Sequence, residues 1–267
     1  MRDENILEVC DLKVWFPIKK GIFSRTSGYV KAVDGVSFEL HRGETLGVVG
    51  ESGSGKSTVA RVITGLQKPT EGSFRLNGRV AMVFQDPLGS LNPRMTVRAT
   101  LEEASRNRTV AVLGDRRGNG ASLSAPVGED ADGTVREFLS LVGLDASALD
   151  KYPHEFSGGQ RQRICIARAI AAKPELLVCD EAVSALDLSI RAQVLDLLED
   201  LKKKLGLSLL FITHDLGVVQ HIADRILVMN RGKIIEEGPC GQVLKAPREE
   251  YTRYLISSVP KIGKPLT

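Results

Sequence analysis

The sequence predicts an α/β fold with a mainly parallel sheet that helices cover on both faces. Three short apolar segments, ELLVCD, LSLLFITHD and DRILVMN, alternate with segments of helical spacing between residues 175 and 230. Strands that are buried on both faces of a parallel sheet read as such unbroken apolar runs. A glycine-rich stretch, GESGSGKST, stands between a further apolar strand and a helical segment. It indicates a strand–loop–helix unit in the same sheet.

The composition is that of an ordinary globular protein. The chain has 267 residues, of which 42% are hydrophobic and 26% charged, enough for one large domain or two small ones. The formal net charge of +3 gives no reason to expect nucleic-acid binding. No apolar run approaches the roughly 20 residues of a membrane-spanning helix. The first ten residues, MRDENILEVC, lack the apolar core of a secretory signal. We therefore expect any role at a membrane to be peripheral.

The four cysteines are far apart and form no CxxC pair: Cys10, Cys165, Cys179 and Cys240. We expect small hydrophobic side chains in a reducing cytosol, and neither metal ligands nor disulfide partners.

Residues 6–49 are predicted to be mostly strands. KAVDGVSFEL alternates between apolar and polar residues with a turn at Asp34-Gly35, and residues 41–43 mark a second turn. ETLGVVG is a short apolar strand, and STVARVITGL, at residues 57–66, reads as a helix. In FRLNGRVAMVF, the pair Asn77-Gly78 stands between two strand-like runs and predicts a hairpin.

The character of the sequence changes over residues 88–150. TVRATLEEASRNR and GTVREFLSLVGL have helical spacing. Between them, residues 114–133 are rich in Gly, Asp and Ser, which predicts a mobile surface loop. Further on, a helix over 164–172 precedes the three apolar strands, which are separated by helices over 189–206 and around 217–223.

The glycine-rich stretch fits the phosphate-loop pattern G-x-x-x-x-G-K-[ST]. Its glycines let the backbone curl so that consecutive N–H groups converge on one anion. Lys56 would reach the β- and γ-phosphates of ATP, and the hydroxyl of Ser57 would ligate Mg²⁺. The predicted ATP-binding residues of the loop are Gly50, Glu51, Ser52, Gly53, Ser54, Gly55, Lys56, Ser57 and Thr58.

Two carboxylates follow a predicted buried strand, because Asp180 ends ELLVCD and Glu181 comes next. A charge at the end of a buried strand is costly without a partner, and Mg²⁺ would supply one to Asp180. Glu181 would then lie near the γ-phosphate, where a carboxylate can orient and deprotonate the attacking water. A strand that simply reaches solvent would also end in such residues, but the phosphate loop in the same chain favours the catalytic interpretation.

Two further polar residues stand at predicted strand ends. His214, in FITHD, is placed to donate to a γ-phosphate oxygen, although a lone histidine is more often structural. Gln85, in VFQDP, has an amide that would ligate the metal and sense the γ-phosphate. The other three histidines, His41, His154 and His221, are expected to be structural.

A second phosphate-gripping segment lies well after the phosphate loop. In KYPHEFSGGQRQR, Ser157 and Gln160 fit the S-x-x-Q capping box that begins a helix. Gly158 and Gly159 leave backbone N–H groups open to an anion at the positive end of the helix dipole. The chain thus poses the question of whose phosphate this second segment binds.

The order and spacing of six motifs resemble those of the nucleotide-binding subunits of ABC transporters. These motifs are the phosphate loop, the glutamine of VFQDP, FSGGQRQR, LLVCDE, SALD and ITHD. The resemblance covers nearly the whole chain. It implies a P-loop NTPase fold of the ABC ATPase type, with a mainly parallel core, an N-terminal antiparallel β subdomain and an inserted helical subdomain. The implied boundaries are 1–267 for the ATPase domain, 86–156 for the helical subdomain and 238–267 for a C-terminal extension.

In this family, two ATPase subunits close head to tail around ATP. The resemblance therefore implies that the segment from Ser157 to Gln160 caps the γ-phosphate of ATP on the partner's phosphate loop, and that Asp187, in SALD, lies at the dimer seam. It implies ATP and Mg²⁺ as cofactors, with Glu181, His214 and Gln85 in catalysis. The implied metal-binding residues are Ser57, Gln85 and Asp180.

The resemblance leaves two points to settle, namely a departure from the family pattern after Glu181 and the choice of the residue that stacks on adenine. Ala182 stands where the family commonly has proline, which changes the stiffness of the loop but leaves the carboxylate of Glu181 in place, so the resemblance implies a hydrolysing subunit. An aromatic residue of the early strands usually stacks on adenine. Phe16 is the first choice for that role and Trp15 the second, although aromatic residues here are equally compatible with a core position.

Two stretches resemble one subgroup in particular, the importer ATPases for oligopeptides and dipeptides. They are FQDPLGSLNPRMTV, at residues 84–97, and the tail APREEYTRYLISSVP, in which Tyr251-Thr252 and Pro260 match and Glu249-Glu250 departs from the usual His-Pro. The resemblance implies integral membrane permease subunits, an indirectly coupled extracytoplasmic substrate-binding protein, and a position at the cytoplasmic face of the cell membrane. The second ATPase subunit would be a related chain or an identical one.

Two alternatives stay open. The subgroup also includes ATPases for nickel, metal–chelator complexes and other small solutes, so the cargo is not fixed by this chain. ABC-type ATPases also serve in DNA repair and translation, but this sequence has neither a long coiled-coil insertion nor two motif sets. One further departure concerns FRLNGRVAMVF, which directly joins two strands that a helical stretch usually separates in the family.

Overall fold

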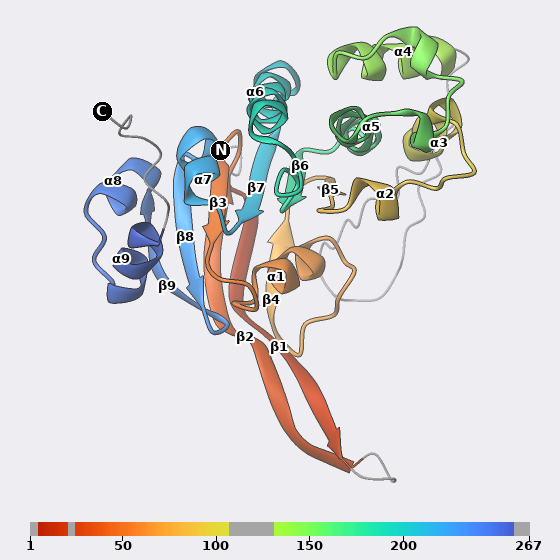
Figure 1. Ribbon diagram of the computed structural model, residues 1–267. Coiled ribbons are helices and arrows are strands. Elements are labelled where there is room, and N and C mark those ends of the chain that lie inside the picture. Colours follow the sequence, from red (N-terminus) through yellow and green to blue (C-terminus); the bar gives the residue numbers. More distant parts are fainter. Residues whose placement is uncertain (1–4, 21–24, 107–130, 259–267) are drawn as a thin grey trace.

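The computed structural model describes residues 5–20, 25–106 and 131–258. Within them the chain forms two sheets, and most of the helices lie around the six-stranded one (Figure 1). Most of the predicted surface loop at 114–133, and Pro260 of the tail, lie outside the described residues.

The three-stranded sheet is antiparallel and has the order β2-β1-β4. Its strands are β1 (Asn5–Lys20), β2 (Arg25–His41) and β4 (Glu71–Leu76). The six-stranded sheet has the order β5-β6-β7-β3-β8-β9 and is parallel except for β9, which runs antiparallel to β8. Its strands are β5 (Val80–Val83), β6 (Leu176–Asp180), β7 (Ser208–Thr213), β3 (Thr45–Val49), β8 (Arg225–Asn230) and β9 (Lys233–Pro239). The predicted mainly parallel core and N-terminal antiparallel unit are thereby confirmed.

Most of the helices lie where the sequence places them, with bounds that differ by a few residues, but those at 87–90, 240–245 and 250–257 were not predicted. The helices are α1 (Lys56–Ile63), α2 (Pro87–Ser90), α3 (Val97–Arg106), α4 (Ala131–Leu141), α5 (Gly158–Ala171), α6 (Leu188–Leu205), α7 (Leu216–Ile222), α8 (Cys240–Lys245) and α9 (Glu250–Ser257). Two short 3₁₀ turns, η1 (Ala146–Ala148) and η2 (Pro153–Glu155), lie between α4 and α5. Figure 1 shows α3, α4 and α5 together, beyond the edge of the six-stranded sheet.

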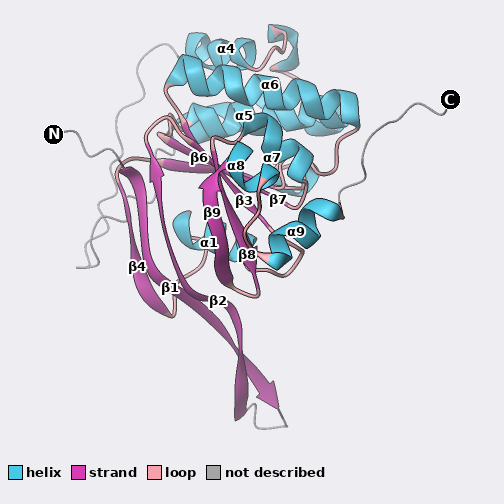
Figure 2. Ribbon diagram, turned by 90° about the vertical axis from the view of Figure 1, so that its left-hand side faces the viewer, coloured by secondary structure: helices cyan, strands magenta, loops and turns pink. Residues whose placement is uncertain are grey.

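The central strands of the six-stranded sheet, β3, β6 and β7, are buried on both faces. On β7, Leu209 and Phe211 join an apolar cluster with residues of α5 and α6, whereas Leu210 and Ile212 join a second cluster with α1 and the antiparallel sheet. Successive side chains of a strand point to opposite faces, so a strand covered on both sides must be apolar throughout. Figure 2 shows the antiparallel sheet and α5 with α6 on opposite sides of this core.

The predicted hairpin at Asn77-Gly78 is wrong, because β4 and β5 belong to different sheets. The backbone N–H of Asn77 donates to the carbonyl of Ile6 at 2.8 Å, in the antiparallel unit. The backbone N–H of Arg79 donates to the carboxylate of Glu175 at 2.6 Å, beside the six-stranded sheet. An Asn-Gly pair supplies the backbone freedom for a tight turn but does not select the strand that pairs next. No helix lies between β4 and β5, in line with the direct connection expected from the sequence.

The predicted turn at Asp34-Gly35 is also wrong, because β2 runs through both residues. Leu12 pairs with Val36 and Lys13 with Asp34, so Gly35 is an extra residue in β2 and forms a bulge. Its φ of 82° lies in the left-handed region, which glycine adopts readily. Gly35 therefore bends the strand without ending it.

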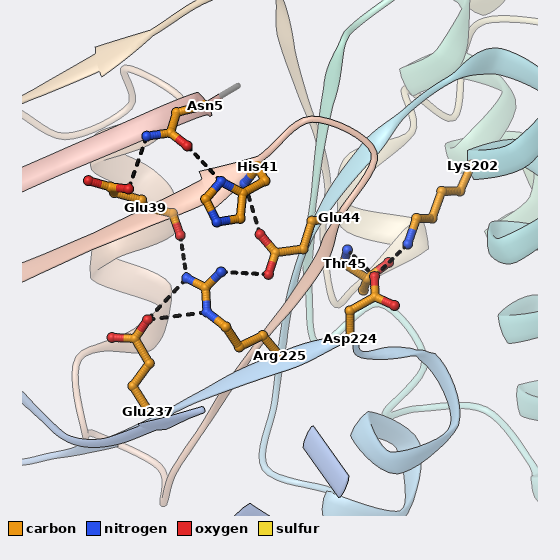
Figure 3. Close-up of polar contacts among 9 residues, drawn as sticks. All are labelled: Asn5, Glu39, His41, Glu44, Thr45, Lys202, Asp224, Arg225 and Glu237. Atoms are coloured by element: carbon orange, nitrogen blue, oxygen red, sulfur yellow. Dashed lines mark hydrogen bonds and ion pairs between the residues drawn. The ribbon is translucent and has the colours of Figure 1, made fainter. Parts of the chain in front are cut away.

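A polar network fastens the two sheets to each other (Figure 3). The guanidinium of Arg225 on β8 donates to the carboxylate of Glu44 at 2.7 Å, to the carboxylate of Glu237 on β9 at 3.0 Å and to the carbonyl of Glu39 on β2 at 2.7 Å. The other oxygen of the Glu44 carboxylate accepts from the backbone N–H of His41 at 2.8 Å. One planar guanidinium thus joins three strands from both sheets.

Candidate functional site

The polar residues predicted for catalysis gather where four neighbouring strands end. β3 leads into the phosphate loop, β6 ends at Asp180, and β5 and β7 end shortly before Gln85 and His214. Since β5, β6, β7 and β3 are parallel neighbours in the sheet, their carboxyl ends meet at one edge. The strand order therefore brings together residues that are far apart in the sequence.

The phosphate loop has a backbone that requires glycine. The φ angles are 152° at Gly50 and 105° at Gly55. A Cβ on Gly50 would lie 2.2 Å from the carbonyl oxygen of Met229, and one on Gly55 would lie 2.2 Å from that of Ala32. The helix α1 begins at Lys56 with no side-chain cap from Gly55. Its first N–H groups have no intrahelical partners, so they are available to an anion held by the loop.

Lys56 is buried under this loop, with only 4% of its surface exposed. Its ammonium donates to the carbonyls of Gly50 at 2.7 Å and Glu51 at 2.8 Å, and to the hydroxyl of Ser54 at 3.2 Å. Burial lowers the pKa of Lys56, and the nearby carboxylates of Glu181 and Asp180 oppose that shift. A buried cation that is satisfied only by neutral oxygens is poised to exchange them for phosphate oxygens.

Ser57 and Asp180 form a pair that fits a divalent cation. The Ser57 hydroxyl donates to the Asp180 carboxylate at 2.8 Å. Burial raises the pKa of Asp180, and the hydrogen bond from Ser57 and the positive charges of Arg61 and Lys56 offset that shift only in part. Within the described residues, no three His, Cys, Asp or Glu side chains gather as a metal site. A hydroxyl and one carboxylate are the few protein ligands that Mg²⁺ takes when phosphates supply the others.

The Glu181 carboxylate is held by both of its oxygens. Gln85 Nε2 donates to one at 3.1 Å, and His214 Nδ1 lies 3.2 Å from the other. The backbone of Glu181 has a φ of 50°, which is strained for a residue other than glycine. Its N–H donates to the carbonyl of Ile212 at 2.9 Å, which holds the residue in that conformation. Three strand ends therefore fix the direction of one carboxylate.

The loop after β7 is held by hydrogen bonds to α7 and α6. The Asp215 carboxylate accepts from the backbone N–H of Gly217 at 2.9 Å and so caps α7. Its other oxygen accepts from Arg191 of α6 at 2.7 Å. These contacts fix the segment that carries His214, so the imidazole approaches Glu181 from a rigid support.

The predicted capping box at the start of α5 is present. The backbone N–H of Gln160 donates to the Ser157 hydroxyl at 3.3 Å, and the backbone N–H of Ser157 donates to the Gln160 side chain at 3.1 Å. A Cβ on Gly158 would meet nothing within 4 Å, whereas one on Gly159 would lie 2.6 Å from Cγ2 of Ile190 on α6. Gly159 is thus required by packing as well, a reason that the sequence did not suggest.

The capping segment at Ser157–Gln160 does not meet this chain's own phosphate loop. None of the hydrogen bonds among the described residues joins the two, and both ribbon views separate α5 from α1 (Figures 1 and 2). Asp187 is exposed at the N-cap of α6, and Leu188 beside it has 72% of its surface exposed. These residues are therefore available to another molecule.

The two aromatic residues proposed for adenine lie on β1. Phe16 is paired with Val30 and has 42% of its surface exposed. Trp15 has its ring 4.8 Å from the Lys31 ammonium and 6.3 Å from the Tyr29 ring, centroid to centroid. Neither residue makes a hydrogen bond or ring contact with the phosphate loop among the described residues, so the adenine contact remains a prediction.

One residue beside the loop had no role in the sequence interpretation. Tyr251 on α9 accepts a hydrogen bond from the backbone N–H of Glu51 at 3.2 Å. The sequence marked Tyr251 only as part of a tail, because no local pattern links a C-terminal helix to an N-terminal loop.

None of the helices in the described part of the chain is long and apolar enough to cross a membrane.

Comparison with known proteins gives one consistent result. The family model described as ABC transporter matches residues 33–184. The oligopeptide transport ATP-binding protein AppF of Bacillus subtilis is 47% identical, over 98% of this chain and 80% of that protein. The dipeptide transport ATP-binding protein DppF of Escherichia coli is 44% identical, over 97% of this chain and 78% of that protein.

Solved structures agree on the fold. An ATP-binding cassette, solved as a dimer in a post-hydrolysis state bound to ADP and Pi, has a TM-score of 0.69 and 26% identity, over 88% of this chain and 98% of that one. The structure of cbiO1 from Clostridium perfringens, part of the ABC transporter complex cbiONQ, has a TM-score of 0.73 and 24% identity, over 97% of this chain and 98% of that one.

Proposed function

This chain belongs to the ABC transporter family of ATP-hydrolysing subunits, and from that premise we propose that it powers an importer of oligopeptides or dipeptides. The observation that carries the catalytic part of the proposal is the Glu181 carboxylate, held between Gln85 and His214 beside the phosphate loop. The peptide cargo is supported by relatives that are named for oligopeptide and dipeptide transport.

ATP would bind with its β- and γ-phosphates on the loop from Gly50 to Thr58. The buried ammonium of Lys56 would exchange the loop carbonyls for phosphate oxygens, which are stronger acceptors because they are charged. Mg²⁺, held by Ser57 and Asp180 and contacted by Gln85, would neutralise charge on the phosphates. Phe16 would stack on adenine.

Glu181 would orient a water molecule and take its proton as the water attacks the γ-phosphate. The amide of Gln85 holds one carboxylate oxygen and leaves the other beside His214. A carboxylate restrained in this way loses little conformational freedom when the water arrives. His214 would donate a hydrogen bond to the γ-phosphate, which places it between the base and the group that is transferred.

The functional unit in this proposal is a head-to-tail dimer of ATPase subunits. Ser157, Gly158, Gly159 and Gln160 of one subunit would cap the γ-phosphate on the other, with Asp187 at the seam. Support comes from the separation of this segment from its own phosphate loop, and from the dimeric state of a structural relative with ADP and Pi. ATP would then hold the dimer closed by contacts that are lost on hydrolysis.

The helical part of the chain would couple this cycle to transport. We assign residues 86–156 to a helical subdomain that begins next to Gln85, and residues 238–267 to a C-terminal extension of the single ATPase domain at 1–267. The helical subdomain would contact integral membrane permease subunits at the cytoplasmic face of the membrane. The partner ATPase would be a related second chain or a second copy, and an extracytoplasmic binding protein would deliver the substrate to the permease.

The cargo is tested by reconstitution. The complex that co-purifies with this chain from membranes is placed in liposomes, and its ATPase rate is measured with a substrate-binding protein that carries a tripeptide. A rise in rate that depends on the peptide supports the proposal. Stimulation by a nickel–chelator complex, with none by peptides, would assign the chain to metal uptake instead.

A further inference from the structure

The C-terminal helix α9 contacts the phosphate loop across 200 positions of sequence. The backbone N–H of Glu51 donates to the Tyr251 hydroxyl at 3.2 Å. Burial raises the pKa of Tyr251, and the hydrogen bond from the Glu51 backbone opposes that shift. A protonated phenol can accept this hydrogen bond and still donate one of its own.

A buried carboxylate fixes α9 in this position. Glu236 on β9 accepts from the backbone N–H groups of Arg248 at 2.8 Å and Glu249 at 3.2 Å, which lie at the start of α9. Burial alone would raise the pKa of Glu236, but these two donors, together with the side chain of Thr252 and the positive charge of Arg248, hold it below its ordinary value. The helix is thus tied to the sheet at the two residues that precede it, two to three positions before Tyr251.

A cavity of about 410 Å³ separates the rest of α9 from the loop. Its walls are loop residues 50–52 on one side, residues 214–216 on another, and Tyr254, Leu255 and Ser258 on the third. The Tyr251 hydroxyl is therefore a discrete link beside an open space, and α9 is not packed continuously against the loop.

The backbone of Glu51 is held at both its N–H and its carbonyl. Its N–H is bound by Tyr251, and its carbonyl accepts from the Lys56 ammonium at 2.8 Å and from the backbone N–H of Ser54 at 3.1 Å. When the ammonium turns to a phosphate, the carbonyl loses that contact, whereas the contact with Tyr251 does not depend on Lys56. A loop that is fixed before binding loses less entropy when the nucleotide arrives.

We propose that Tyr251 is a positioning residue for ATP binding, which holds the backbone N–H of Glu51 so that the phosphate loop is preformed. The C-terminal helix, anchored by Glu236, would thereby set the nucleotide affinity of a loop at the other end of the chain. This inference rests on the proposed function, because it takes residues 50–58 to be the ATP site.

The test is Tyr251→Phe in the full chain, which removes only the hydroxyl. The Kd for ADP with Mg²⁺, measured by calorimetry, and the KM for ATP should both rise about two- to tenfold, the effect of one hydrogen bond. The kcat should stay within about twofold, and the unfolding midpoint of the nucleotide-free protein should not change, since this exposed contact adds little to global stability. The matched control is Tyr254→Phe, because no hydrogen bond of that hydroxyl is found among the described residues, and it should leave all four quantities unchanged.

A second variant tests the anchor. Glu236→Gln should raise the Kd in the same direction, and the double variant with Tyr251→Phe should be no weaker than Tyr251→Phe alone, because both act through one contact. Any of three results would overturn the inference. They are an unchanged Kd in Tyr251→Phe, an equal rise of the Kd in Tyr254→Phe, and a rise of the Kd in Tyr251→Phe that is accompanied by a lower unfolding midpoint of that variant. Lys56→Ala is measured alongside: if it still binds ATP, the proposed function fails, whatever Tyr251→Phe does.

Discussion

Glu181 Oε1 lies 3.2 Å from His214 Nδ1, although the two residues follow different strands and are 33 positions apart in the chain. Gln85 donates to the other oxygen of the same carboxylate at 3.1 Å. Parallel pairing of β5, β6 and β7 produces this arrangement, because it sets three strand ends side by side. A carboxylate held at both oxygens is a rigid base, and the strained φ of 50° at Glu181 is maintained by the same surroundings.

Glu181→Gln should keep ATP binding and slow turnover by about 10²–10⁴, or roughly 3–5 kcal/mol of barrier, because the amide cannot accept the proton of the water. Steady-state ATPase rates and nucleotide titration measure the two quantities separately. The variant should also accumulate as an ATP-bound dimer in size-exclusion chromatography. Glu103→Gln, at an exposed position of α3, is the matched control. Turnover close to that of the wild type in Glu181→Gln would remove it as the base.

Lys56→Ala should lose nucleotide affinity itself, because it removes the cation that donates to the loop carbonyls of Gly50 and Glu51. Calorimetric titration with ATP checks this without any need for hydrolysis. Lys203→Ala changes the same residue type on the outer surface of α6, where 73% of the side chain is exposed, and should bind ATP normally. Equal affinities in the two variants would count against the assignment of the loop.

Asp180→Asn should stabilise the nucleotide-free protein while abolishing ATPase activity. Burial raises the folded-state pKa of Asp180 above its unfolded value, so the unfolded state loses this proton at lower pH than the folded state does. The ionised group therefore costs stability above the folded pKa, and the wild type recovers that stability as pH falls through it. The gain in Asp180→Asn should be about 0.5–2 kcal/mol at pH 8.

Chemical denaturation at a series of pH values from 8 downward gives the sign of this effect. The difference in unfolding free energy between Asp180→Asn and the wild type should shrink as the pH falls through the folded-state pKa of Asp180. A variant that is no more stable than the wild type at pH 8 would show that Ser57 and Lys56 already compensate the charge of Asp180.

Gly159→Ala should destabilise the protein by about 1–3 kcal/mol, because its Cβ would lie 2.6 Å from Ile190 and force α5 away from α6. Gly158→Ala is the neighbouring control, since its Cβ would meet nothing within 4 Å and its stability should not change. Thermal unfolding of the two variants separates them. The packing argument fails if both unfold at the midpoint of the wild type.

The strands of the core and the edge where the site lies follow from local sequence. Unbroken apolar runs such as LSLLFITHD identify strands that are buried on both faces, and polar residues at their carboxyl ends identify the site. The sequence alone did not reveal which strand each run pairs with. Asn77-Gly78 was expected to close a hairpin but carries the chain between two sheets, because its neighbours are bound by residues distant in sequence.

Contacts between residues that are distant in the sequence could likewise not be predicted from it. Nothing in the residues around Gly159 indicates that Ile190 stands against it, and nothing around Tyr251 indicates its bond to Glu51. Both contacts depend on how complete helices are placed, which is set by packing across the whole core. The capping box of Ser157 and Gln160, in contrast, was predicted correctly because its partners are three residues apart.

The central claim is that the segment from Ser157 to Gln160 completes the catalytic site of a partner. The most direct test uses a dimer whose two subunits carry different tags, with Ser157→Arg in one of them. A photoactivatable ATP analogue is hydrolysed, trapped with vanadate and cross-linked, so that it labels the subunit whose phosphate loop performed the hydrolysis. The account predicts that label stays on the Ser157→Arg subunit and disappears from its partner. Loss of label from the Ser157→Arg subunit alone would contradict it.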